Sequence, residues 1–411
     1  MRKLLITLLA ALWALTLSAQ SFDAVFQDAT LRLDYVLCGN SAHQNIYLEE
    51  MGRIPGWAGK RTHLEAPLLR GNGQIRLLDP VSGEVLYAES FSTLFQEWQV
   101  TEEATRVQRA FEACFRVPFP RQPVQVELSL RDIHGKVSSS LRHLVDPADI
   151  LIRQHRPNMA ECREIHSGGS VQEAVDILII ADGYTAAEKE KFFADAARAR
   201  DALFDHEPFA TRSFDFNIRA AFLPSQESGV SIPHDSLWVN TLADSHFDTF
   251  YTARYLTTAS MRKVHDAAGT IPFEHLILMC NTANYGGGGI YNFITFMPSG
   301  HATFPQVLVH EFGHAFGGLG DEYYYDDQYD SQYPSDTEPW EPNITTLVDF
   351  DSKWKDLIPK GEAGLYEGGG YQSKGVWRPA EDCRMKTNTC PDFCPVCTRA
   401  LNRMMDYATG R

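Results

Sequence analysis

Residues 310–322 read HEFGHAFGGLGDE, and the spacing inside this stretch predicts a metal-dependent hydrolase. Two histidines four residues apart on a helix lie on one face, so the imidazoles of His310 and His314 can bind one metal ion. Glu311 lies between them, in position to accept a proton from a water. Zinc peptidases build their hydrolytic centres in this way. We therefore expect Zn²⁺ as the cofactor, His310 and His314 as ligands and Glu311 as the catalytic base.

A catalytic zinc ion commonly takes three protein ligands and keeps one position for water, so a third ligand is needed. In the metzincin pattern a glycine three residues after the second histidine ends the helix, and Gly317 has that place. The usual ligand position, Gly320, has no side chain. Asp321 follows it, and a carboxylate suits Zn²⁺. We expect Asp321 as the third ligand and Glu322 as the fallback, although Asp321 capping a turn is an alternative.

Other zincins take a glutamate from a second helix further along the chain. Glu338 and Glu341 are available, but each is followed by a proline and a regular helix is excluded there. Met385 is expected in a turn beneath the metal, with a core methionine or a surface residue of a cysteine-rich loop as the alternatives. The run Gly286–Gly289 is either a flexible turn or the rim of a cleft on which an extended substrate pairs.

Two regions with different patterns of apolar and polar residues indicate a two-domain chain. Residues 20–150 alternate apolar and polar side chains between turns, which predicts an all-β sandwich. Residues 151–411 alternate strands with helices, which predicts an α/β (α+β) catalytic domain. Thr185 and Glu188 form a capping-box signature at the start of a helix. We expect further helices near residues 245–268 and from about residue 303, and strands at residues 175–181, 216–223, 275–280 and 291–297.

The first 19 residues have the pattern of a secretory signal peptide: Arg2 and Lys3, an apolar run and then Ala19. We expect an exported protein in the periplasm, on the outer surface or secreted, with no membrane span. The net charge of −16 argues against a nucleic acid partner. The expected partner is a protein or peptide substrate, and no motif specifies the oligomeric state.

Four of the eight cysteines fall in one short C-terminal segment: Cys383, Cys390, Cys394 and Cys397. Two interpretations compete for them. They form disulfides, which export favours, or they build a second, structural metal site.

Several motifs together resemble the M64 metallopeptidases, a family that includes a bacterial immunoglobulin A peptidase. They are HEFGHAFGGLGDEY, the preceding YGGGG, DGYT at Asp182–Thr185, ESGVSIP at Glu227–Pro233, and the terminal CRM with FCPVC. The resemblance covers residues 175–406, and the sandwich resembles the domain that precedes the catalytic domain in that family. It implies a zinc endopeptidase of metzincin-like architecture with His310, His314 and Asp321 as ligands and Glu311 as base. It implies no particular substrate.

Two rival functions come from other classes. One is a catalytically inactive zincin-fold binding protein for a host protein or glycan, against which the retained Glu311 counts. The other is an adhesin that binds Ca²⁺ through Asp326, Asp327 and Asp330, which lack the spacing of an EF-hand loop. For an active enzyme, the candidates for stabilising the oxyanion are Tyr323, Tyr324 and Arg378.

Overall fold

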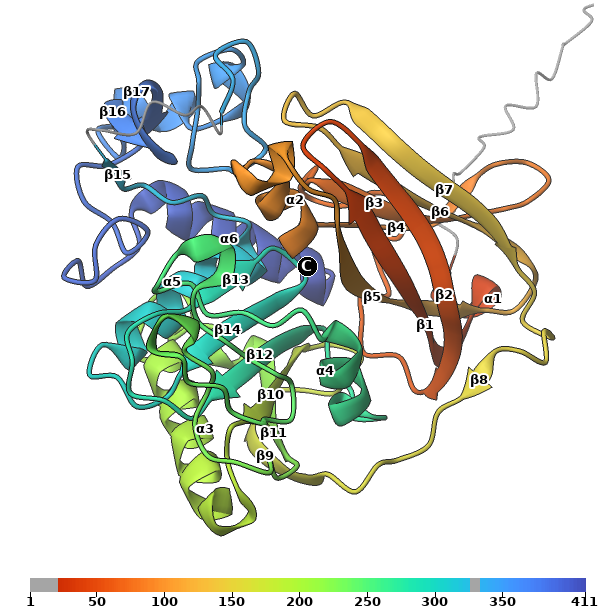
Figure 1. Cartoon of the computed structure of the whole chain (residues 1–411). Coiled ribbons are helices and arrows are strands. Elements are labelled where there is room, and N and C mark those ends of the chain that lie inside the picture. The colour runs from red at the N-terminus through yellow and green to blue at the C-terminus, as the bar shows by residue number, and fades with distance from the viewer. Residues whose placement is uncertain (1–20, 326–332) are drawn as a thin grey trace, which may run out of the picture.

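The computed structural model describes residues 21–325 and 333–411 (Figure 1). The predicted signal peptide lies outside the described residues, as do Asp326, Asp327 and Asp330 of the calcium hypothesis. In the described part of the chain, no helix is long and apolar enough to cross a membrane.

The N-terminal region consists mainly of two four-stranded sheets, with strand orders β5-β1-β2-β8 and β4-β3-β6-β7. Every pairing is antiparallel except that of the short β8 with β2. Two short helices accompany the sheets, so the region is rich in strands rather than made of strands alone. The elements are α1 (Phe22–Val25), β1 (Phe26–Gly39), β2 (Gln44–Pro55), β3 (Gly73–Leu78), β4 (Val85–Phe91), α2 (Leu94–Gln99), β5 (Arg109–Pro120), β6 (Val124–Arg131), β7 (Val137–Val145) and β8 (Arg153–Gln154).

The second region is built on a six-stranded sheet of order β13-β14-β12-β10-β11-β9. Its four central strands are parallel, and the two edge strands β9 and β13 are antiparallel to their neighbours. A small sheet of order β15-β17-β16 follows in the chain. The elements are β9 (Glu161–Ser167), β10 (Val175–Asp182), α3 (Lys189–Phe204), β11 (Phe216–Phe222), α4 (Met261–Ala268), β12 (His275–Cys280), β13 (Gly288–Ile290), β14 (Ile294–Pro298), α5 (Phe304–Gly317), β15 (Tyr324–Tyr325), β16 (Tyr366–Gly369), β17 (Tyr371–Arg378) and α6 (Pro395–Thr409).

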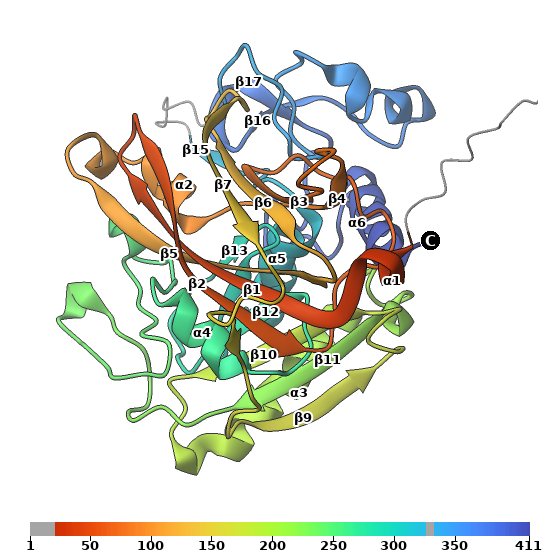
Figure 2. The same ribbon diagram turned by 90° about the vertical axis from the view of Figure 1, so that its right-hand side faces the viewer.

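Both faces of the six-stranded sheet are covered, which explains why β10 is apolar along nearly its whole length. Ile177 and Ile179 belong to the core that the sheet shares with α3, α5 and α6. Leu178 and Ile180 belong to a second core, which contains α4 and the inner faces of the N-terminal sheets. Figure 2 shows the N-terminal sheets stacked against this second face. One hydrophobic core therefore extends from the N-terminal region into the second region.

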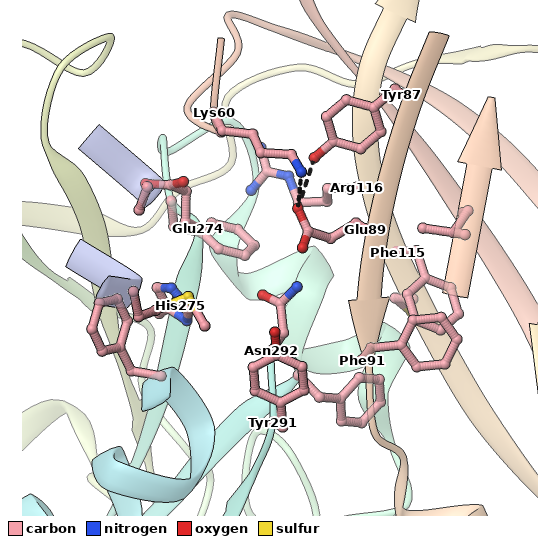
Figure 3. Close-up of a pocket in the computed structure, with 18 of the residues that line it drawn as sticks. Lys60, Tyr87, Glu89, Phe91, Phe115, Arg116, Glu274, His275, Tyr291 and Asn292 are labelled. Carbon is pink, nitrogen blue, oxygen red and sulfur yellow. Dashed lines mark hydrogen bonds and ion pairs between the residues drawn. The ribbon is translucent and has the colours of Figure 1, made fainter. Parts of the chain in front are cut away.

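The contact between the two regions also contains a cavity of about 110 Å³, lined mainly by apolar side chains and by a few charged groups (Figure 3). Lys60 pairs with Glu89 at 3.5 Å, and Tyr87 donates a hydrogen bond of 3.2 Å to the same carboxylate. Glu274 and His275 line the opposite wall. Burial lowers the pKa of Lys60, and the nearby Glu89 opposes this shift. The space is large enough for several waters among these groups.

Most predicted elements are present, and the long helical segment near residues 245–268 is wrong. Only Met261–Ala268 is helical there. Asp248 and Phe250 have left-handed backbone conformations, and the hydroxyls of Thr249 and Thr257 bind each other at 2.7 Å. Because left-handed residues cannot continue a right-handed helix, this stretch forms a packed loop. By contrast, the capping box of Thr185 and Glu188 is present, ahead of α3.

Candidate metal centre

Helix α5 presents the two motif histidines, and the turn that ends it brings Asp321 back beside them. The helix ends at Gly317, as predicted, and the following Gly318 takes the left-handed conformation, with φ of 60°. Its N–H donates to the carbonyl of His314 at 3.0 Å, and the N–H of Leu319 donates to that of Gly313 at 3.2 Å. These bonds close the helix in the manner of a glycine C-cap and reverse the chain.

The side chains of His310, His314 and Asp321 converge on one point. The two Nε2 atoms are 3.1 Å apart, and Asp321 Oδ1 lies 3.0 Å from that of His310 and 3.2 Å from that of His314. All three ligand-type atoms lie within 4.8 Å of one another. The structure thus brings together the three residues that the sequence predicts as ligands.

Hydrogen bonds on the far side of each ligand-type group fix its orientation. His310 Nδ1 donates to the carbonyl of Arg384 at 2.9 Å, and His314 Nδ1 donates to that of Leu319 at 2.5 Å. A carbonyl only accepts, so both Nδ1 atoms carry a hydrogen, and a cation would bind through the two Nε2 atoms. Tyr371 donates its hydroxyl hydrogen to Asp321 Oδ2. Two imidazoles and a carboxylate, each oriented by a hydrogen bond on its far side, fit a divalent metal ion.

The electrostatics of this cluster favour positive charge. Burial favours the neutral imidazole of His314, but Asp321 and Glu311 outweigh burial and raise its pKa to about 10. Burial likewise opposes ionisation of Asp321, yet the two histidines hold its pKa well below the usual range. The protein surrounds this point with two carboxylates, and a cation placed there is stabilised.

Glu311 extends along the edge strand β13, close to the histidines. A Cβ atom added to Gly287 would lie 3.2 Å from Cγ of Glu311, and one added to Gly289 would lie 2.1 Å from its carbonyl oxygen. Glycine is therefore required for β13 to approach α5 this closely. Burial raises the pKa of Glu311, and Asp321 adds to this effect while the histidines oppose it.

A cleft of about 890 Å³ opens over these residues. Besides α5 and β13, its walls include Glu97 and Thr101 of the N-terminal region, in which the sequence showed nothing catalytic. Tyr255 donates its hydroxyl hydrogen to Glu97, and burial raises the pKa of that glutamate to about 7. Sequence reasoning missed Glu97, Tyr255 and Tyr371. The glycine run directly before Tyr371 was the one local signal available.

The remaining predicted site residues lie at different distances from the centre. Met385 is buried directly beneath α5, where a Cβ added to Gly313 would be 2.8 Å from its sulfur. Tyr323 stacks on the His310 ring with centroids 6.3 Å apart, and Tyr324 lines the cleft. Arg378 is buried and donates to the carbonyls of Glu367 and Gly368, so it does not line the cleft.

The cysteines form no disulfide: all eight are free thiols. Cys383, Cys394 and Cys397 instead gather around Glu322 in a second cluster. The fallback assignment of Glu322 to the histidine site is therefore wrong, because its carboxylate belongs to the cysteine cluster and lies 3.1 Å from Cys397 Sγ.

A helix that carries HExxH, an aspartate that returns beside its two histidines and an adjacent glutamate in an open cleft together form the arrangement typical of metallopeptidases. The family model described as IgA Peptidase M64 matches residues 164–363 and 359–405, and the one described as Peptidase M64 N-terminus matches residues 21–142. The chain belongs to the M64 peptidase family and is a peptidase. None of the curated proteins compared with it matches.

Proposed function

We propose that this protein is an exported zinc-dependent endopeptidase that hydrolyses peptide bonds with Glu311 as the general base. The observation that carries the proposal is the convergence of His310, His314 and Asp321 beside Glu311 at the floor of the cleft. We further propose residues 1–19 as a signal peptide, 20–150 as the sandwich domain and 151–411 as a metzincin-like catalytic domain.

The donor set supports zinc. His310, His314 and Asp321 would hold the ion, which supplies Lewis acidity and lowers the pKa of a bound water. Calcium and magnesium prefer oxygen ligands, and two of the three donors here are imidazole nitrogens.

The chain's own groups account for the remaining chemistry. Glu311 is buried beside the histidines, and its carboxylate accepts the proton from the attacking water and passes it to the leaving amine. Tyr371 and the carbonyls of Arg384 and Leu319 keep the three ligands in one orientation. Tyr323, stacked on His310, is the best placed of the three oxyanion candidates.

The cleft suits an extended polypeptide. Strand β13 is the last strand of its sheet on the cleft side and lines the cleft with its glycines. An extended substrate that adds to this edge would place a backbone carbonyl near Glu311. The buried Met385 beneath α5 and the return of the chain after Gly318 support the metzincin-like architecture.

The catalytic assignment is tested by Glu311→Gln. We expect casein cleavage to fall by about 10²- to 10⁴-fold, the usual contribution of a general base, because the amide cannot accept the proton. The metal content should stay that of the wild type, since Glu311 is not a proposed ligand. Glu341→Gln, which changes another cleft carboxylate, is the matched control and should keep activity within a few-fold. Wild-type cleavage by the Glu311 variant would refute the mechanism.

Export is tested separately by expressing the full chain in a bacterial host and fractionating the cells. We expect the protein outside the cytoplasm with its N-terminus at or near residue 20. An uncleaved chain confined to the cytoplasm would refute the export proposal without touching the catalytic one.

A further inference from the structure

A second group of metal-ligating side chains lies behind the candidate catalytic centre. It consists of Glu322, Cys383, Cys394 and Cys397, whose ligand-type atoms all lie within 4.8 Å of one another. Cys394 is 6% exposed and the other three are 0% exposed. The four come from three segments: the chain after α5, the loop before α6 and the first turn of α6.

The spacing of the sulfur atoms is that of ligands on a shared ion. Cys383 Sγ and Cys397 Sγ are 3.8 Å apart. A disulfide bond is about 2.05 Å long. Two thiolates on one tetrahedral zinc ion, each with a Zn–S distance of about 2.3 Å, are separated by about 3.8 Å. The observed separation matches the shared-ion value.

The backbone around the cluster stabilises thiolates. The N–H of Cys394 donates to Cys383 Sγ at 3.2 Å, and the N–H of Cys397 donates to Cys394 Sγ at 3.5 Å. Cys394 is also the N-cap of α6, a helix of 15 residues whose N-terminal end carries positive partial charge. Low-pKa cysteines and metal-binding cysteines occupy such positions.

The carboxylate of Glu322 gives independent evidence for a bound cation, because one of its oxygens has no hydrogen-bond partner among the described residues. Its Oε1 accepts a hydrogen bond of 2.9 Å from Asn343 and lies 3.1 Å from Cys397 Sγ. Its Oε2 is buried and has no hydrogen-bond partner. A fully buried carboxylate with an unpartnered oxygen is strongly unfavourable unless a cation or a further donor meets it.

A disulfide would not account for all the groups in this cluster. Three sulfurs meet there, so any one disulfide leaves a third thiol beside the buried Glu322. The fourth cysteine of the segment, Cys390, lies outside the cluster, where its thiol donates to the carbonyl of Asp392 at 3.4 Å. A single ion uses all four groups at once.

We propose that Glu322, Cys383, Cys394 and Cys397 form a second, structural metal site that binds Zn²⁺. Four protein ligands in a buried, closed site leave no position for water, which is the arrangement of structural rather than catalytic zinc. Binding releases the protons of the three thiols, since thiolates are the ligands.

This ion would fix both sides of the catalytic centre. Glu322 follows Asp321 directly, so the two sites take consecutive residues of one segment. Cys383 precedes Arg384, whose carbonyl orients His310, and the N–H of Glu322 donates to the carbonyl of Met385 at 2.8 Å. The structural ion would therefore fix the position of Asp321 relative to the loop whose Arg384 carbonyl orients His310.

The test is a metal count on the full chain by inductively coupled plasma mass spectrometry. The wild type should hold two zinc ions per chain, and His310→Ala combined with His314→Ala should hold one. In that double variant, Co²⁺ in place of zinc should give the intense sulfur-to-cobalt charge-transfer absorption of thiolate ligands. Cys394→Ser with Cys397→Ser should lose the second ion, whereas the control Cys390→Ser should keep two.

A folded His310→Ala, His314→Ala variant that holds no metal, or Co²⁺ absorption without thiolate character, overturns the proposal. So does a disulfide among Cys383, Cys394 and Cys397, detected by mass spectrometry of the unreduced wild type. These readouts need no peptidase activity, so they stand apart from the test of Glu311. They also decide the matter if the cysteine variants do not fold.

Discussion

The hydroxyl of Tyr371 should strengthen metal binding at the histidine site. It donates to Asp321 Oδ2, while the other oxygen of that carboxylate faces both histidines. Tyr371→Phe keeps the ring, which packs against Tyr323 with centroids 5.2 Å apart. The change removes one hydrogen bond to a charged ligand and leaves Oδ2 of a carboxylate that is 7% exposed without that donor.

The expected loss of zinc affinity is about 10- to 100-fold, the usual effect of removing a hydrogen-bond partner behind a metal ligand. This corresponds to about 1.4–2.7 kcal/mol, which agrees with the value of a hydrogen bond to a charged group. Competition against a chromogenic chelator measures the affinity. Tyr325→Phe is the matched control, because that hydroxyl binds Arg254 at 2.6 Å instead of Asp321. An affinity within about threefold of the wild type for Tyr371→Phe would refute the reasoning.

Three further predictions concern stability, each measured by urea unfolding of the full chain. Gly289→Ala should cost about 1–3 kcal/mol, because its Cβ would lie 2.1 Å from the carbonyl oxygen of Glu311, while Gly169→Ala, with its nearest contact at 3.4 Å, should not destabilise; equal midpoints would contradict this. Burial lowers the pKa of His275 to about 4, so the unfolded chain binds its proton first and stability should fall as the pH drops from about 6.5 to 4. The contribution of His275 should be at most about 1.4 kcal/mol per pH unit, and His275→Leu should lack it, so its stability should fall less steeply with pH; parallel curves for the two proteins would exclude this. Asp182→Ala should lower the free energy of unfolding by about 3 kcal/mol or more, since the buried carboxylate accepts hydrogen bonds from Ala243, Thr241 and Ser245. An unchanged midpoint would contradict this and would indicate that water takes the place of the carboxylate.

The sequence predicted best what depends on local pattern. The apolar run at residues 175–181 indicated a strand covered on both faces, and β10 is such a strand. The four-residue spacing placed His310 and His314 on one face of α5, and their side chains meet. In these cases the periodicity of one element carries the information, and tertiary packing does not alter it.

Features that depend on contacts between distant segments were not predictable. Glu97 comes from a short helix in the first region, and only the docking of that region brings it to the cleft. Residues 245–260 have helix-like spacing of apolar residues, but hydroxyl pairs and left-handed residues impose a loop. Asp321 and Glu322 are alike in chemistry and adjacent in sequence, so only the backbone direction after Gly318 assigns each to its own cluster.

The bond between Tyr255 and Glu97 limits how freely the two regions can be exchanged. Each region contributes one of the two bonded residues, and both residues line the same cleft. The two regions also share one hydrophobic core. A chimera that takes its first 150 residues from another chain would therefore have to reproduce both the packing surface and a carboxylate at this position. The N-terminal region supplies part of the wall of the candidate cleft, so we expect the family's two matched regions to vary together rather than as independent modules.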